Sequence, residues 1–101
     1  FHERCYLAAA VHGGQDDAAQ LEQIADLARQ LALPMVATND VHYHVSERRP
    51  LHDVLTAIRH GTTVAQLGAL RFPNGERHLK APAEMARLFA RYPDAIARTI
   101  E

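Results

Sequence analysis

Two short apolar runs flank one amphipathic stretch in the first part of the chain. Residues 5–11 and 34–38 have the length and the neighbouring glycine or proline of buried strands, although the alanines of the first run weaken that interpretation. Between them, residues 16–31 repeat apolar side chains at helical spacing, and Asp17 with Gln20 resembles a capping box. The helical stripe comprises Leu21, Ile24, Ala28 and Leu31. The pattern predicts a strand–helix–strand unit with parallel strands and a right-handed crossover.

Residues 46–61 predict a second helix. Ser46 is a candidate N-cap, Pro50 suits a first helical turn, and Gly61 is a typical C-terminal stop. The apolar stripe, which we expect to be buried, comprises Leu51, Val54, Leu55 and Ile58. The face that we expect to point away from the core carries His52, Asp53, Thr56 and Arg59.

The remaining segments are shorter. Residues 63–67 predict one helical turn, 69–75 a loop and 77–80 a short extended piece. Two further helices are expected to begin at Pro82 and Pro93. Their apolar positions are Met85, Leu88, Phe89 and Tyr92 in the first, and Ile96 and Ile100 in the second.

These elements indicate an α/β fold whose second half is rich in helices. We expect residues 1–46 to form the strand–helix–strand unit and 47–101 a helical part. A chain of 101 residues makes one small domain or a piece of a larger one. Because it opens directly in strand-like sequence at Phe1, we expect a segment of a longer protein.

Composition narrows the function classes. Apolar residues make up 48% and charged residues 23%, as in an ordinary globular domain, and a net charge of −1 gives no electrostatic case for nucleic-acid binding by this stretch. A single cysteine, Cys5, excludes an internal disulfide; we expect it to be buried in its strand. We expect neither a membrane span nor a signal peptide, and a cytoplasmic location with its reducing environment.

Candidate chemistry gathers where the predicted strands end. In parallel α/β folds, functional side chains collect at the carboxyl ends of strands, which is where Asn39, Asp40 and His42 follow one strand and His12 follows the other. Asp40 and His42 would point to the same side of an extended backbone and could bind zinc, manganese or iron. His44 would share that face. The alternative is that Asp40 caps a loop and that His42 packs beside it.

Four runs of residues resemble one protein family. Residues 36–43 (VATNDVHY) resemble the last metal motif of the polymerase-and-histidinol-phosphatase (PHP) domain, found in bacterial replicative polymerase alpha subunits. Residues 42–56 (HYHVSERRPLHDVLT) and 74–80 (NGERHLK) are similar to the error-prone branch of that family. Residues 81–89 (APAEMARLF) are similar to a segment shared by error-prone and replicative members.

The resemblance implies a fold, a site and an activity. The fold would be the carboxyl-terminal part of a distorted βα barrel with a divalent metal site. Asp40 and His42 would be ligands from its final motif, and Asn39, His12 and His44 would be possible second-shell residues. Some members with this site are metal-dependent 3′–5′ exonucleases, whereas others keep the domain as a scaffold.

The resemblance also implies partners for the longer protein. It would be a template-directed nucleotidyltransferase in translesion synthesis, with DNA and deoxynucleotides as substrates and two catalytic magnesium ions in its polymerase core. A sliding clamp and mutagenesis accessory proteins would be its protein partners. We expect no interaction with a membrane. Two alternatives stay open: a stand-alone phosphoesterase of the same superfamily, and a metal-free scaffold. Because most ligands would lie outside the chain, we expect the isolated chain to bind metal weakly.

Overall fold

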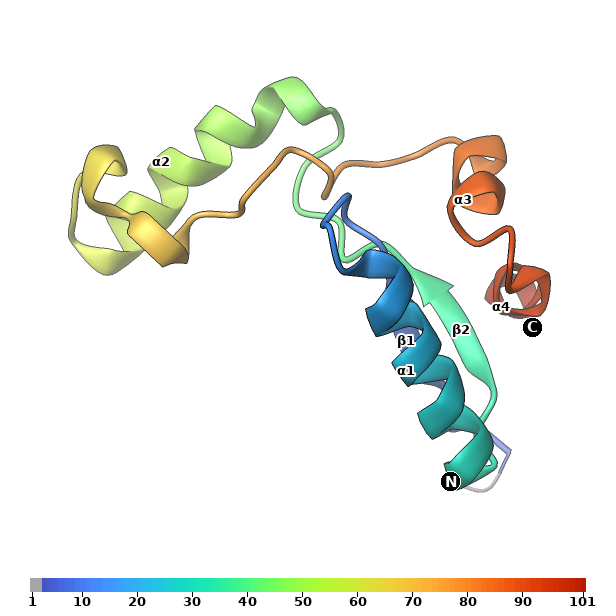
Figure 1. Ribbon diagram of the computed structural model, residues 1–101. Coiled ribbons are helices and arrows are strands. Elements are labelled where there is room, and N and C mark those ends of the chain that lie inside the picture. Colours follow the sequence, from blue (N-terminus) through green and yellow to red (C-terminus); the bar gives the residue numbers. More distant parts are fainter. Residues whose placement is uncertain (1–2) are drawn as a thin grey trace. The chain divides into compact units, whose positions relative to one another are not determined.

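The computed structural model describes residues 3–101, which combine strands and helices (Figure 1). These residues form two compact units. Unit 1 takes the chain up to Asn39 together with Lys80–Glu101, and unit 2 is Asp40–Leu79. The predicted organisation into a strand–helix–strand part at residues 1–46 and a helical part at 47–101 stays a prediction.

Unit 1 is built on the predicted strand–helix–strand unit. Strands β1 (Leu7–Ala10) and β2 (Met35–Thr38) pair in parallel, with Leu7 opposite Met35 and Ala10 opposite Thr38. Helix α1 (Asp17–Leu31) connects them and packs on both strands (Figure 1). The prediction of a parallel pair joined by a helix is therefore confirmed.

The core of unit 1 forms between the sheet and the helices. Helix α1 buries Leu21, Ala25 and Ala28, while Leu31 in its last turn is 54% exposed, so its predicted burial is wrong. Ala25, one turn after Leu21 and three residues before Ala28, completes the buried stripe of the helix. The stripe therefore ends at Ala28, one turn earlier than predicted.

Two short helices complete unit 1. They are α3 (Pro82–Leu88) and α4 (Pro93–Ala97), each with proline in its first turn as predicted, and α4 lies against β2 (Figure 1). Phe89, directly after α3, is fully buried, and Ala95 joins it in the core. The predicted last helix includes Ile100, but α4 ends at Ala97, and Ile100 lies in a following 3-10 turn and is 91% exposed.

Two predictions at the start of unit 1 are also wrong. Cys5 precedes the first residue of β1 and is exposed rather than buried, because pairing with β2 begins only at Leu7. Asp17 forms no capping box with Gln20: its Oδ2 accepts a hydrogen bond of 2.9 Å from the backbone N–H of Gly14, which lies before the helix. The carboxylate thereby closes the turn that leads from the sheet into α1.

Unit 2 is organised around α2 (Arg49–His60). A 3-10 turn (Ser46–Arg48) leads into it, and Ser46 starts this turn without capping it through its side chain, contrary to prediction. Pro50 lies in the first turn of α2 and Gly61 ends the helix at φ 63°, as predicted. The rest of the unit contains further 3-10 turns (Val64–Gln66 and Gly68–Leu70). Residues 77–80 form no strand, but His78 makes an isolated parallel bridge with Tyr43.

Helix α2 buries its polar face and exposes the apolar face that the sequence pattern predicts to be buried. The predicted buried stripe is exposed by 43–71%, with Ile58 the most exposed of the four. Asp53 and Ala57 are the buried residues instead. The reason lies in long-range contacts: Arg71 pairs with Asp53, and Phe72 stacks on the adjacent His52. The polar face of α2 therefore packs inside unit 2, and the apolar face is left on the surface.

The described residues thus form a mixed helix and strand structure. The sheet within residues 3–101 has two strands, β1 and β2. The longest helix, α1, has 15 residues, and no helix in this part of the chain is long and apolar enough to cross a bilayer.

Candidate metal centre

Asp40 and His42 lie together at the start of unit 2. Oδ1 of Asp40 is 3.4 Å from Nε2 of His42. Two ligand atoms that share one tetrahedral zinc ion at about 2.0–2.1 Å lie about 3.3 Å apart, so this spacing fits a shared ion. The backbone differs from the prediction: Asp40 has φ 44°, in the left-handed region, rather than an extended conformation. Aspartate tolerates this region better than most residues.

Arg77, close to the last residue of unit 2 in the sequence, contacts both Asp40 and His42. Its guanidinium pairs with Oδ2 of Asp40. Its carbonyl oxygen accepts hydrogen bonds from the backbone N–H groups of His42 (2.9 Å) and Tyr43 (3.3 Å). Arg77 therefore holds the Asp-x-His segment through both its side chain and its backbone.

The ring of His42 packs against a cluster of rings. It makes edge contacts with Phe72 (4.8 Å between centroids) and His52 (5.1 Å), and these two rings stack on each other at 4.9 Å with 12° between their planes. The guanidinium of Arg77 lies 4.2 Å above the Phe72 ring, a cation–π distance. Tyr43 is buried and donates a hydrogen bond of 3.4 Å to the carbonyl of Asn74. These contacts fix the ring of His42 with Nε2 toward Asp40.

The remaining predicted residues are placed differently. In unit 1, Nε2 of His12 lies 2.9 Å from the carbonyl oxygen of Asn39, and the Lys80 ammonium lies 3.5 Å from the Asn39 side-chain oxygen. The ends of the two strands are thus joined, as their position in the sequence predicted. His44 is exposed in unit 2, and no described contact joins it to Asp40 or His42.

The donor set within the described chain is incomplete for a metal. Residues 3–101 contain no group of three or more histidine, cysteine, aspartate or glutamate side chains that could hold an ion. Asp40 and His42 fit as two ligands, and structural or catalytic zinc takes three or four from the protein. Any further ligands would come from outside the described residues. The metal role of Asp40 and His42 stays a prediction.

Sequence reasoning missed three residues of this centre: His52, Phe72 and Arg77. The sequence pattern places His52 on the solvent face of its helix, because it predicts that the apolar stripe lies inside. Phe72 fell in a predicted loop. Arg77 was part of a basic cluster with His78 and Lys80, which is a common surface pattern. Its one signal was its position two residues after the Asn74-Gly75 turn.

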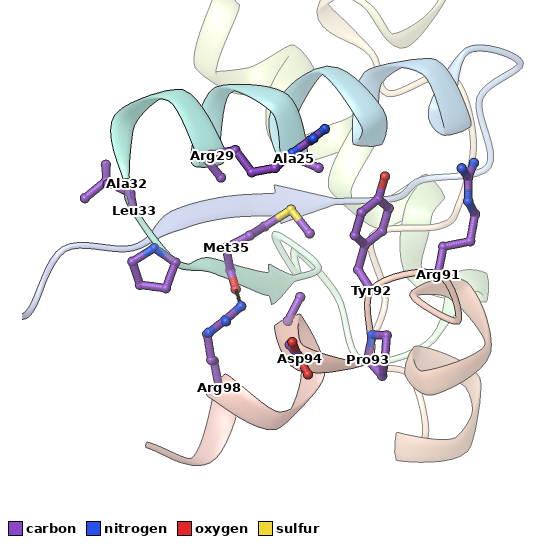
Figure 2. A pocket seen from close by; sticks show the side chains of 13 residues that line it. Ala25, Arg29, Ala32, Leu33, Met35, Arg91, Tyr92, Pro93, Asp94 and Arg98 are labelled. Atoms are coloured by element: carbon purple, nitrogen blue, oxygen red, sulfur yellow. Dashed lines mark hydrogen bonds between the residues drawn. The ribbon is translucent and has the colours of Figure 1, made fainter.

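Unit 1 carries a separate groove of about 550 Å³ (Figure 2). Ala25, Ala28 and Met35 contribute apolar surface, and Arg29, Arg91 and Arg98 also line it. Arg98 donates a hydrogen bond of 3.0 Å to the carbonyl oxygen of Met35 (Figure 2). The groove contains none of the predicted site residues.

Comparison with known proteins gives a consistent result. No protein-family model matches the chain. A protein of Mesorhizobium japonicum named error-prone DNA polymerase is 57% identical over 84 residues, which are 83% of this chain and 8% of that protein. The protein of the same name from an Azoarcus species is 52% identical over 99 residues, covering 97% of this chain and 9% of the relative. Error-prone DNA polymerase 1 of Agrobacterium fabrum is 43% identical over all 101 residues, again 9% of its length.

This chain is homologous to one short segment of error-prone DNA polymerases. It spans 8–9% of the length of these relatives. The similarity covers the Asp40 to Arg77 region as well as the strand–helix–strand unit, since two of the alignments include at least 97% of the chain.

Proposed function

We propose that this chain is a segment of an error-prone DNA polymerase and belongs to its PHP domain. The observation that carries the proposal is the identity of 43–57% over 83–100% of the chain to proteins of that name. The name also favours a polymerase over a stand-alone phosphoesterase. The two-stranded parallel sheet with its crossover helix is compatible with a piece of a βα barrel.

The activity proposed for the longer protein is template-directed DNA synthesis past damage, in the cytoplasm. Its substrates would be DNA and deoxynucleotides, and its catalytic magnesium ions would belong to the polymerase core. A sliding clamp and mutagenesis accessory proteins are proposed as partners from the family resemblance. The segment itself would contribute to a metal site and to the scaffold around it.

Within that protein, Asp40 and His42 would hold a divalent ion such as zinc, manganese or iron. The 3.4 Å spacing of Oδ1 and Nε2 supports this role. Such an ion, when bound, would supply a Lewis acid and an activated water for phosphodiester hydrolysis. Asp40 would contribute negative charge, and His42 an imidazole nitrogen oriented by its packing against Phe72 and His52.

One observation favours a second candidate, a metal-free scaffold. Arg77 already gives Asp40 a cationic partner. An aspartate paired in this way can fasten residues 40–43 to residues 72–78 without any ion. In that case the Asp-x-His motif would serve the architecture of unit 2 alone.

The metal content of the full-length polymerase distinguishes the two candidates. Elemental analysis is carried out on the purified wild type and on the Asp40→Ala and His42→Ala variants, with His60→Ala at the exposed end of α2 as control. We expect both motif variants to lose bound zinc, manganese or iron and the control to retain it. Unchanged content in both motif variants would show that the ligand assignment is wrong and would favour the scaffold.

A further inference from the structure

We propose that Arg77 is a positioning residue for the candidate metal centre. By engaging Oδ2 of Asp40, it turns Oδ1 toward Nε2 of His42 and fixes the spacing at which the two atoms can share an ion. This inference rests on the proposed metal role of Asp40 and His42, and it assigns a task to a residue 37 positions away in sequence.

Asp40 needs such a partner because little else holds its side chain. The side chain is 59% exposed, and its backbone has a left-handed φ of 44°. An exposed carboxylate rotates freely and can present either oxygen. Arg77 removes this freedom, since the oxygen that it engages is the one that does not face His42.

Arg77 is itself held in place. Its side chain is 22% exposed and its guanidinium lies 4.2 Å above the Phe72 ring. The same ring contacts His42 at 4.8 Å. Phe72 therefore supports both halves of the centre: it packs against one ligand directly and against the other through Arg77. A planar guanidinium can stack on this ring and bond a carboxylate at the same time, whereas lysine offers only a point charge.

The geometry also argues against competition between Arg77 and the ion. An arginine that filled the metal position would lie between Oδ1 and Nε2. Arg77 instead bonds Oδ2, so an ion on the Oδ1 side would leave its contact intact. Partners of metal ligands that act in this way typically change metal affinity by about 10–100-fold when they are removed.

The test uses the full-length polymerase and zinc itself. Zinc affinity is measured by competition with a chromophoric chelator for the wild type, Arg77→Met, Arg77→Lys and Asp40→Ala, with Arg59→Met on the exposed part of α2 as control. The melting temperature of each metal-free protein and the visible spectrum of each cobalt-loaded protein are recorded in parallel. The band positions of the spectrum report the coordination of the cobalt ion, and a mere loss of folded protein lowers their intensity without moving them.

We expect Arg77→Met to weaken zinc binding by about 10-fold or more and to alter the cobalt spectrum, with the melting temperature of the metal-free protein unchanged. Arg77→Lys should restore part of the affinity. Unchanged or tighter binding in Arg77→Met would overturn the inference, as would a loss that follows the melting temperature with an unaltered spectrum. If Asp40→Ala weakens binding and Arg77→Met does not, only this inference fails. If neither does, the proposed metal role fails as well.

Discussion

Asp53 holds its carboxylate Oδ2 3.3 Å from Nε of Arg71, although only 4% of the aspartate is exposed. Arg49, one helical turn earlier on α2, lies 4.0 Å from the same oxygen and donates a hydrogen bond of 2.5 Å to the carbonyl of Phe72. Oδ1 of Asp53 has no hydrogen-bond partner among the described residues. The buried charge therefore depends on the two arginines around it.

Removing Arg71 should destabilise the chain. The Arg71→Ala variant leaves a buried carboxylate with only the more distant Arg49, and we expect a loss of about 1–3 kcal/mol in the free energy of unfolding, measured by denaturant titration. Arg59→Ala, which removes an exposed arginine from the same helix, should stay within about 0.5 kcal/mol of the wild type. Equal effects of the two substitutions would contradict the role given to the Asp53–Arg71 pair.

The same pair explains why the orientation of α2 could not be read from the sequence. The 3.6-residue period of its apolar stripe locates the helix correctly, and the usual rule then places that stripe inside. In unit 2 the opposite face packs inside, because its partners Arg71 and Phe72 come from a segment with no periodic pattern. In unit 1 the pattern locates the two strands and their connecting helix, since these elements are close in sequence and bury one another.

The residues of the candidate metal centre also divide into those that the sequence pattern predicts and those that long-range contacts bring in. Asp40 and His42 could be predicted because they follow a buried strand and lie two residues apart. Arg77 could not, because its contacts with them span 35–37 residues along the chain and are made partly through its carbonyl oxygen, which any residue carries.

The inverted helix leads to a prediction about stability. Phe89 is fully buried in unit 1, whereas Ile58 on α2 is 71% exposed. We expect Phe89→Ala to lower the free energy of unfolding of this chain by about 3–5 kcal/mol, because it removes a core aromatic ring and leaves a cavity. Ile58→Ala should change it by no more than about 0.5 kcal/mol. Chemical denaturation followed by circular dichroism measures both, and a large loss with Ile58→Ala would show that the apolar face of α2 is covered.

Helices α1 and α2 end in the same way with different residues. Ala32 (φ 52°) and Gly61 (φ 63°) are both left-handed, and in each case the next N–H bonds back to a carbonyl in the last turn: Leu33 to Ala28 at 2.9 Å and Thr62 to Ala57 at 3.0 Å. Glycine is favoured at this position because it has no Cβ. The alanine should therefore be a strained residue.

Exchanging the two residue types should have opposite effects. We expect Ala32→Gly to stabilise the chain by about 0.5–1 kcal/mol and Gly61→Ala to destabilise it by about 1 kcal/mol. Apart from its own neighbours along the chain, no atom lies within 4 Å of a Cβ built at Gly61, so the second effect would come from the backbone alone. Thermal melting of the two variants checks the signs, and a destabilised Ala32→Gly would disprove the strain at that helix end.

The phenol of Tyr6 should titrate late. It donates a hydrogen bond of 3.0 Å to Oε2 of Glu101, and this bond, together with the negative charge of Glu101, raises the pKa of Tyr6 above 10.0. Because the folded pKa is raised, the stabilising contact is fully present below about pH 10 and is lost as the pH rises through the folded value. Glu101→Gln should move the pKa of Tyr6 back toward 10.0.

Ultraviolet absorbance of tyrosinate measures this shift. The signal of Tyr6 is obtained as the difference between each protein and its Tyr6→Phe counterpart, which removes the contribution of the other tyrosines. Glu22→Gln, on the exposed face of α1, serves as the control and should leave the pKa of Tyr6 unchanged. A pKa that does not respond to Glu101→Gln would mean that the hydrogen bond does not form in solution.

The isolated chain should bind divalent metal weakly. Its described residues bring together Asp40 and His42 as a candidate pair, and two protein ligands leave half of the four coordination positions of zinc to water. Isothermal titration of the 101-residue chain with zinc should show no tight stoichiometric site. His42→Ala should reduce whatever weak binding is present, because His42 lies beside the carboxylate of Asp40. His60→Ala serves as the control and should leave the weak binding unchanged. Tight one-to-one binding by the wild-type chain would mean that other side chains of this chain complete the site, and that the ligand set proposed here is wrong.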